Sequence, residues 1–318
     1  MKQGRFIISL DFELHWGVAE IWDVKQREDY FIATRQSIPL VLSLFEKYNI
    51  HATWATVGFL FAKNKEQLVS FCPKERPTYK DENLSYYKLI DTNQIGENED
   101  EDPFHYAPSL IDKIINTPNQ ELASHTFSHY YCNENGQTID QFDADLKAAQ
   151  NIAKENFNIE LKSLVFPRNQ FNSDFVTIAK RNGIKVVRSN PNQWFWNDNS
   201  STMRIARLLD TYIAFGSSKP VSSKQEMNNN VLILPASRFL RPYITKEKLL
   251  QKIKINRIKN EMKAAAKNNS NYHLWWHPHN FGYSTKENLF YLEDLLKYYT
   301  QLKSNYNFTS STMLEMYP

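Results

Sequence analysis

The sequence predicts an α/β protein, either a barrel or a wound sheet, in which roughly seven short strands alternate with helices. Short apolar runs rich in β-branched and aromatic residues recur along the chain, and stretches with apolar residues at helical spacing lie between them. Polar side chains stand at the ends of several runs. The chain has 318 residues, of which 42% are hydrophobic, which is enough for one large core. We therefore expect residues 1–318 to form a single domain.

The N-terminal region predicts one strand–helix–strand unit. Residues 5–12 form an apolar run of the kind found in strands that are buried on both faces, and Asp11 and Glu13 lie at its end. Apolar residues recur at helical spacing over residues 37–48, and residues 51–57 then indicate a second strand. The first strand thus carries two carboxylates at its carboxyl end.

An inserted polar loop is predicted at about residues 74–104. The segment lacks apolar periodicity and contains the acidic run Glu97–Asp102, which is typical of a solvated surface. A helix over residues 107–115 follows. Residues 121–124 then indicate a short strand that leads directly into His125.

The remaining chain continues the alternation of strands and helices. Asn182 and Gly183 are typical of the end of a helix followed by a turn. We expect further strands at residues 163–166, 184–188, 231–235 and 273–277. We expect helices at residues 139–156 and 173–182, and a Lys-rich amphipathic helix at residues 246–267.

Composition and charge argue against some classes of function. The net charge is +3, with 38 Lys and Arg against 35 Asp and Glu, so no strong field of one sign attracts nucleic acid. The apolar run Phe6–Leu10 is shorter than the roughly 7–15 residues of a secretion signal, and no stretch approaches the ~18 apolar residues of a membrane span. Two cysteines, Cys72 and Cys132, do not make a disulfide framework. We expect a cytoplasmic protein with no membrane span and no nucleic-acid partner.

Two histidines and two carboxylates form the strongest candidate for a functional site. His125 and His129 are four residues apart, a spacing that lets two imidazoles on one side of a helical turn share a metal ion. Asp11 and Glu13 are two residues apart, so both project from the same face of an extended strand. The alternative is a pair of carboxylates that are solvated at the strand end or paired with Arg168.

A histidine at the end of the last predicted strand is the candidate general acid. His277 follows an apolar run, and Pro278 directs the chain out of the strand ladder, which argues against simple burial of the histidine. His279 is a second candidate, because the i, i+2 spacing keeps both imidazoles on one face if the strand continues. A histidine packed in the core is the alternative, and the sequence alone does not separate His277 from His279.

Arginines and tryptophans near strand ends are candidates for further roles. Arg168 follows a predicted strand and could pair with a carboxylate, lowering its pKa, although an ordinary surface arginine has the same sequence signal. Arg238 and Arg241 could bind an anionic group of a substrate, or could serve the structure alone. Stacking on a sugar ring and filling of the core are both open to five tryptophans, which are Trp54, Trp194, Trp196, Trp275 and Trp276. Of these, we expect Trp276 to bind substrate.

The order of these motifs resembles the polysaccharide deacetylases of carbohydrate esterase family 4, the NodB-homology group of metal-dependent amide hydrolases. The H-S/T-x-x-H motif of that family is matched in full by residues 125–129, and Ser9–Glu13 takes the place of its T-F-D-D motif. Its closing strand, which ends in a histidine, is similar to Leu274–His277. Its R-P-x-x-G motif is present only in altered form at Pro167–Gln170, and we assign no counterpart of its Trp-containing fourth motif. The resemblance spans most of the chain.

The resemblance implies a distorted (β/α)7 barrel of the NodB-homology type with one divalent metal ion. In such an enzyme one aspartate is the base, a carboxylate and two histidines hold the metal, and a histidine is the acid. Carried over to this chain, these residues are Asp11 as the base, His277 as the acid, and Glu13, His125 and His129 as the metal ligands.

Phe12 stands where the family pattern has its metal-binding aspartate, so the carboxylate ligand is either Asp11 or Glu13. We favour Glu13, because alternation along a strand lets both carboxylates face the site while Phe12 points away. Arg168 would still orient Asp11. Two imidazoles and one carboxylate suit Zn²⁺ best, and Fe, Co, Ni and Mn are compatible with them.

The activity that the resemblance implies is removal of an N-acyl group, such as acetyl, from a substrate that contains an amino sugar. Without a secretion signal, we expect an intracellular carbohydrate or another small N-acylated substrate, as in the assembly of surface polysaccharides. The altered motifs leave open a hydrolase of the same fold that acts on a non-sugar amide or ureide. A sugar-binding protein that has lost catalysis is the second alternative. The sequence makes no prediction of the oligomeric state.

Overall fold

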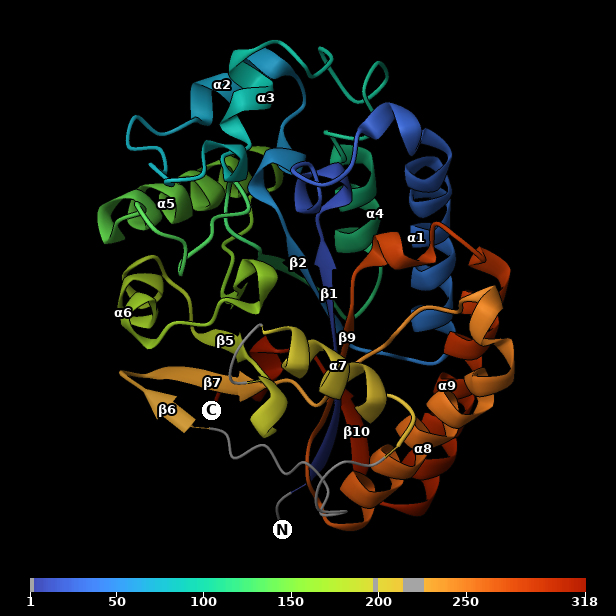
Figure 1. The fold of residues 1–318 in the computed structure, drawn as a ribbon. Coiled ribbons are helices and arrows are strands. Elements are labelled where there is room, and N and C mark those ends of the chain that lie inside the picture. The colour runs from blue at the N-terminus through green and yellow to red at the C-terminus, as the bar shows by residue number, and fades with distance from the viewer. Residues whose placement is uncertain (1–2, 197–199, 214–225) are drawn as a thin grey trace.

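The computed structural model describes residues 3–196, 200–213 and 226–318. Within these ranges ten strands form one sheet in the order β6-β7-β5-β4-β3-β2-β1-β9-β8, with β10 beside the first half of β1 (Figure 1). All pairs are parallel except β6 with β7. The strands are β1 (Gly4–Phe12), β2 (Ala52–Thr56), β3 (Gln120–Ser124), β4 (Ser163–Val165), β5 (Val186–Ser189), β6 (Glu226–Asn228), β7 (Val231–Pro235), β8 (Arg238–Phe239), β9 (Tyr272–Trp276) and β10 (Phe308–Ser311).

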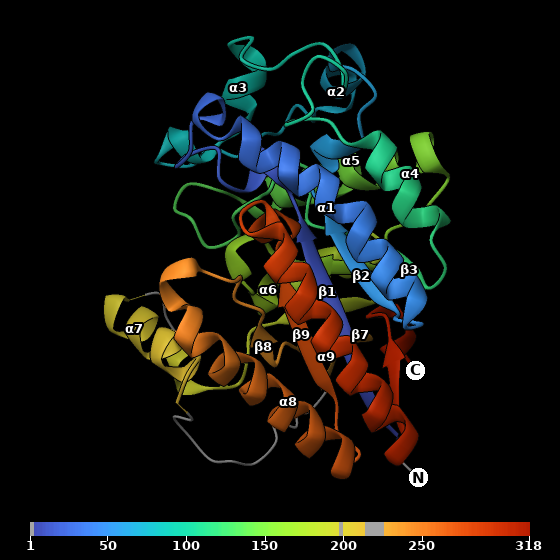
Figure 2. The same ribbon diagram turned by 90° about the vertical axis from the view of Figure 1, so that its right-hand side faces the viewer.

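Helices cover the sheet on its outer side. Figure 2 shows α1, α9 and α8 side by side over β1, β2 and β9, and α9 contacts both of the other helices. The helices of the described ranges are α1 (Glu28–Lys47), α2 (Lys65–Phe71), α3 (Tyr87–Asp91), α4 (Pro108–Asn116), α5 (Ile139–Phe157), α6 (Ser173–Arg181), α7 (Ser201–Asp210), α8 (Gln251–Lys267) and α9 (Thr285–Asn305). None of them is both long and apolar enough to cross a membrane. The expected α/β class is confirmed, and every strand expected from the sequence is present.

β1 is the central strand, and its two faces have different roles. Phe6, Ile8 and Leu10 belong to the large core beneath the helices. The alternate residues, which include Ser9 and Asp11, project from the opposite face and meet polar partners there. Alternation along one buried strand therefore separates the hydrophobic core from a polar interior that holds the candidate site.

α1 begins well before the residue at which the sequence pattern placed it. The helix starts at Glu28, and Pro39 lies in its interior instead of in its first turn, where proline is favoured. Leu42 is buried against the core, whereas Leu40 is 49% exposed. Helical periodicity predicted the helix, but the proline suggested a start near residue 37, because proline is favoured in the first turn and not in the interior of a helix.

The predicted polar loop at residues 74–104 is only partly a loop. It contains α3, and the large side chains of Tyr86 and Tyr87 at the start of this helix are buried. Its acidic run remains largely at the surface, as expected. Residues 74–104 thus contribute packed aromatic side chains as well as a solvated segment.

Two leucines of α1 test how far burial of this face stabilises the fold. Leu42→Ala should lower the free energy of unfolding by about 2–5 kcal/mol, because it removes buried methyl groups and leaves a cavity. Leu40→Ala makes the same change on the exposed side of the same helix and should cost well under 1 kcal/mol. Urea unfolding followed by circular dichroism measures both, and equal losses would contradict the assigned orientation of α1.

Candidate metal centre

The candidate site lies where the carboxyl ends of neighbouring strands meet. Phe12 at the end of β1 pairs with Thr56 of β2, and Thr56 pairs with Ser124 at the end of β3. Glu13 and His125 each follow directly after one of these aligned strand ends. Parallel pairing thus brings together residues that are more than a hundred positions apart in the sequence.

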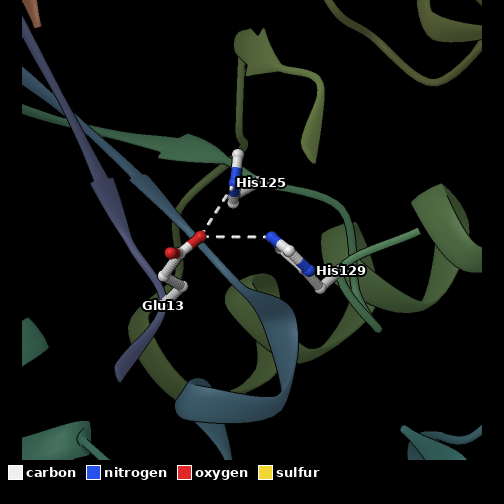
Figure 3. Close-up of side chains that lie close together, drawn as sticks. All are labelled: Glu13, His125 and His129. Atoms are coloured by element: carbon white, nitrogen blue, oxygen red, sulfur yellow. Dashed lines mark ion pairs between the residues drawn. The ribbon is translucent and has the colours of Figure 1, made fainter. Parts of the chain in front are cut away.

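Glu13, His125 and His129 converge on one buried point, as Figure 3 shows. The Nε2 atom of His129 lies 3.1 Å from Oε2 of Glu13, and Nε2 of His125 lies 3.4 Å from the same oxygen. One ligand atom from each of the three residues lies within 4.8 Å of the others, and all three side chains are buried. The spacing and the donor types fit a divalent metal ion.

Hydrogen bonds at the far side of each imidazole direct Nε2 toward this point. Nδ1 of His125 donates to the carbonyl of Val165 at 2.8 Å, so its Nε2 carries a free lone pair. That Nε2 atom is buried and has no hydrogen-bond partner. Nδ1 of His129 lies 3.1 Å from the hydroxyl of Tyr131. Buried nitrogen atoms normally have a hydrogen-bond partner, so the lone pair of Nε2 of His125, which faces Glu13, is suited to bind a metal ion.

The two histidines are joined by a loop, and the helical turn expected from their spacing is wrong. Thr126 and His129 have φ angles of 63° and 58°, in the left-handed region that side chains other than glycine rarely adopt. Asp145 of α5 holds this loop, because its buried carboxylate accepts the backbone N–H groups of Phe127 at 2.6 Å and Ser128 at 3.1 Å. It also accepts the Ser128 hydroxyl at 2.5 Å. No local sequence signal marks Asp145 as the residue that holds this loop.

Asp11 is paired with Arg188 of β5. The guanidinium binds both carboxylate oxygens, at 2.6 and 2.7 Å, and both side chains are buried. Burial is the largest single effect on the pKa of Asp11 and would raise it. The charge and hydrogen bond of Arg188, together with the nearby His125 and His277, lower the pKa below its ordinary value. Asp11 is therefore ionised at neutral pH and fixed in orientation.

Arg168 does not occupy the position expected for it. The predicted contact with Asp11 is made by Arg188, whereas Arg168 forms an ion pair with Glu20 and lies 4.4 Å from the ring centre of Tyr131. Arg168 sits in a turn with a φ of 52°. The signal for Arg188 was present, since it is a charged residue in an otherwise apolar strand, but nothing local linked it to Asp11.

His277 and His279 both lie at the carboxylates. Nε2 of His277 is 3.8 Å from Asp11 and 3.7 Å from Glu13, and Nδ1 of His279 is 3.5 Å from Glu13. The two rings stack with their centres 4.9 Å apart. His279 is buried, and burial together with the neighbouring His277 lowers its pKa to about 4. His277 is 25% exposed at its side chain and lines an adjacent pocket.

The four residues expected to bind substrate differ in position. His279 lies beside Glu13, as described above, and the other three are Trp276, Arg238 and Arg241. Trp276 is fully buried and stacks on Phe281, so no sugar ring can reach it. Its neighbour Trp275, which alternation turns to the other face of β9, lines the pocket beside His277. Arg238 and Arg241 line the same pocket. The expected stacking of Trp276 on a sugar ring is therefore wrong, and the alternative role, filling of the core, is the one that the structure shows.

Comparison with known proteins identifies the family. The polysaccharide deacetylase family model matches residues 28–187, which is 160 of the 318 residues. This range includes His125 and His129 but excludes Asp11, Glu13 and His277. No curated protein matches the chain by sequence.

Solved structures agree with this family in fold. The chain superposes on a protein from Mycobacterium smegmatis named as a polysaccharide deacetylase with a TM-score of 0.61 and 11% identity, covering 99% of this chain and 90% of that one. A second protein of that name, from Pseudomonas aeruginosa PAO1, gives 0.51 and 9% identity over 93% and 84%. The α-amylase AmyC from Thermotoga maritima gives 0.56 and 10% identity over 99% and 74%. At these identities the likeness shows the fold alone, which is the α/β fold of the NodB type. Because the family model matches half of its length, the chain belongs to the polysaccharide deacetylase family.

Proposed function

We propose that the protein is a metal-dependent hydrolase that removes an N-acyl group, such as acetyl, from a substrate containing an amino sugar. The observation that carries this proposal is the convergence of three buried ligand atoms with an arginine-paired carboxylate and two histidines. Burying several charged groups together lowers the stability of a fold. Such clusters are therefore found mostly at functional sites. We propose further that residues 1–318 act as one catalytic domain in surface-polysaccharide assembly.

Glu13, His125 and His129 are the residues that would hold the metal ion. The orphaned Nε2 atom of His125 and the mixed imidazole and carboxylate donors fit such an ion, with Zn²⁺ favoured and Fe, Co, Ni or Mn also compatible. A divalent ion there would supply Lewis acidity to the acyl carbonyl and lower the pKa of water. Burial alone would raise the pKa of Glu13, but the facing His277 and the two ligand histidines lower it well below its usual value. Glu13 is thus a carboxylate that is ready to bind a cation.

Asp11 and His277 would divide the proton transfers. Asp11 is ionised and oriented by Arg188, so it can accept a proton from the attacking water. His277 lines the pocket and can deliver a proton to the leaving amine. His279 is buried and neutral at pH 7, because its pKa is about 4, and so it is the weaker candidate for the acid. It can support His277 through ring stacking.

Metal content and turnover separate the roles of these residues. Wild-type protein purified without chelator should hold about one equivalent of divalent metal, measured by elemental analysis, and release acetate from an N-acetylated amino sugar. His129→Ala should abolish metal binding, and Asp11→Asn should keep the metal but lose turnover. His51→Ala, at the opposite end of β2, is the control. Absence of metal after Zn²⁺ addition would refute the proposal, and metal loss in Asp11→Asn would exchange the roles of Asp11 and Glu13.

Asp145 provides a test of how the ligand loop is held. Asp145→Asn replaces an acceptor of three hydrogen bonds with an amide whose NH₂ group meets donors, so the loop should shift. We expect the zinc affinity to fall by about 10–100-fold, as measured by competition with a chromogenic chelator. Asp140→Asn changes an exposed residue of the same helix and should leave the affinity within about twofold. Unchanged affinity in Asp145→Asn would show that the loop holds its shape by itself.

Arg188 and Arg168 can be distinguished through the pH dependence of turnover. Because Arg188 lowers the pKa of Asp11, Arg188→Gln should raise that pKa and move the acidic limb of the kcat/KM profile to higher pH. Arg188→Lys keeps the charge and should shift the limb less, which guards against misfolding of the first variant. Arg168→Gln should leave the limb in place, since Arg168 pairs with Glu20. A shift in Arg168→Gln alone would restore the role expected from the sequence.

A further inference from the structure

A pocket of about 330 Å³ opens beside His277. It lies between α7, the strand β8 and the end of β9, which Figure 2 shows next to one another. Its lining combines aromatic side chains, among them Trp275 and Phe239, with four arginines. These arginines are Arg204, Arg207, Arg238 and Arg241. The volume is at the lower end of the range for small-molecule sites and suits a group about the size of one sugar.

Arg238 is fully compensated by acidic neighbours. Its guanidinium pairs with Asp210 at 3.0 Å and with Glu261 at 2.6 Å, and Arg257 also pairs with Asp210 at 2.8 Å. Asp210 is the one acidic residue among the described lining residues. The charges of Asp210 and Arg238 are therefore neutralised within the wall of the pocket. Because Arg238 is already paired with two carboxylates, the anion-binding role expected for it from the sequence is not supported.

Arg241 is only partly compensated. Its Nη2 atom lies 3.6 Å from Glu247, whose carboxylate also faces Lys254 at 3.3 Å. Glu247 accepts the hydroxyl of Tyr212 as well, so one carboxylate serves two cations and a hydroxyl. Nε of Arg241 is buried and has no hydrogen-bond partner. Arg241 therefore has an N–H group without an acceptor, and its nearest carboxylate is distant and shared with Lys254. A guanidinium in this state can bind a further anion.

Arg204 adds a second available charge. It lies exposed on α7, and within the described residues no ion pair or hydrogen bond engages its side chain. The aromatic wall beside it includes Trp275, which packs against Phe239 with ring centres 4.7 Å apart. The same tryptophan also meets Arg188, whose guanidinium carbon is 4.4 Å from its ring centre. Trp275 therefore contacts both the pocket and the arginine that pairs with Asp11.

We propose that this pocket binds an anionic group of the substrate, a phosphate or a carboxylate, through Arg204 and Arg241. The inference rests on the proposed function, because it places the anion next to the acylated sugar at His277. A phosphate would come from a nucleotide-linked or lipid-linked sugar, and a carboxylate from a neighbouring uronic acid. Apolar walls weaken the competition of water and strengthen the attraction between the anion and the arginines.

Kinetics on three probes test the pocket. The probes are the neutral methyl glycoside of N-acetylglucosamine, N-acetylglucosamine 1-phosphate, and a disaccharide of N-acetylglucosamine with glucuronic acid. Arg241→Gln and Arg204→Gln should each raise KM for an anionic probe about tenfold and leave kcat/KM for the neutral probe within about twofold. Arg181→Gln, which removes an exposed arginine from α6, should change neither. Whichever anionic probe shows the selective loss identifies the source of the charge.

Binding without turnover separates this inference from the proposed function. In Asp11→Asn protein loaded with Zn²⁺, calorimetry should detect the anionic probes, with affinity lost in the additional Arg241→Gln variant and reduced by added salt. If no probe releases acetate but this selective binding persists, the proposed function fails and the pocket assignment stands. Equal losses for neutral and anionic probes, or no selective binding of either anion, would overturn the pocket assignment. Arg204 is exposed, so its variant keeps the test open if Arg241→Gln does not fold.

Discussion

The organisation of the site follows from burying two carboxylates at the end of one strand. Asp11 and Glu13 are both buried, and an ionised carboxylate without compensation is among the most costly groups to bury in a protein. The two are compensated in different ways. Asp11 is paired with the guanidinium of Arg188, which is always charged. Glu13 instead faces imidazoles, which are also suitable ligands for a metal ion. Arg188 thereby fixes the orientation of Asp11, whereas Glu13 is still able to bind a cation.

The site could be predicted from sequence as far as its residues lie within local motifs. The spacings of Asp11 with Glu13 and of His125 with His129 identified four residues that the fold brings together. Arg188 could not be assigned, because it reaches Asp11 from β5, on the far side of β2, β3 and β4 in the sheet order. Compensation of charge is a nonlocal property, and a single sequence does not record which strand supplies it.

The fold was predictable where strands are apolar and long enough to show a pattern. Each of the seven expected strands is present, but the short strands β6 and β8 lack such a pattern. The helix α7 is amphipathic and was nevertheless not expected from the sequence. The error at Trp276 has a related cause. Two adjacent tryptophans in one strand face opposite sides, and only the packing of β9 decides which side is the pocket.

The segment of residues 74–104 packs against the candidate metal centre. Tyr86 stacks on His129 with ring centres 5.8 Å apart, and its hydroxyl lies 2.7 Å from that of Tyr131, which in turn contacts the same histidine. Residues 74–104 are therefore part of the surroundings of His129, one of the candidate metal-binding residues. If Glu13, His125 and His129 hold a metal ion, thermodynamic linkage would couple the affinity for that ion to the packing of Tyr86 against His129. A change that weakens this packing would then also weaken metal binding.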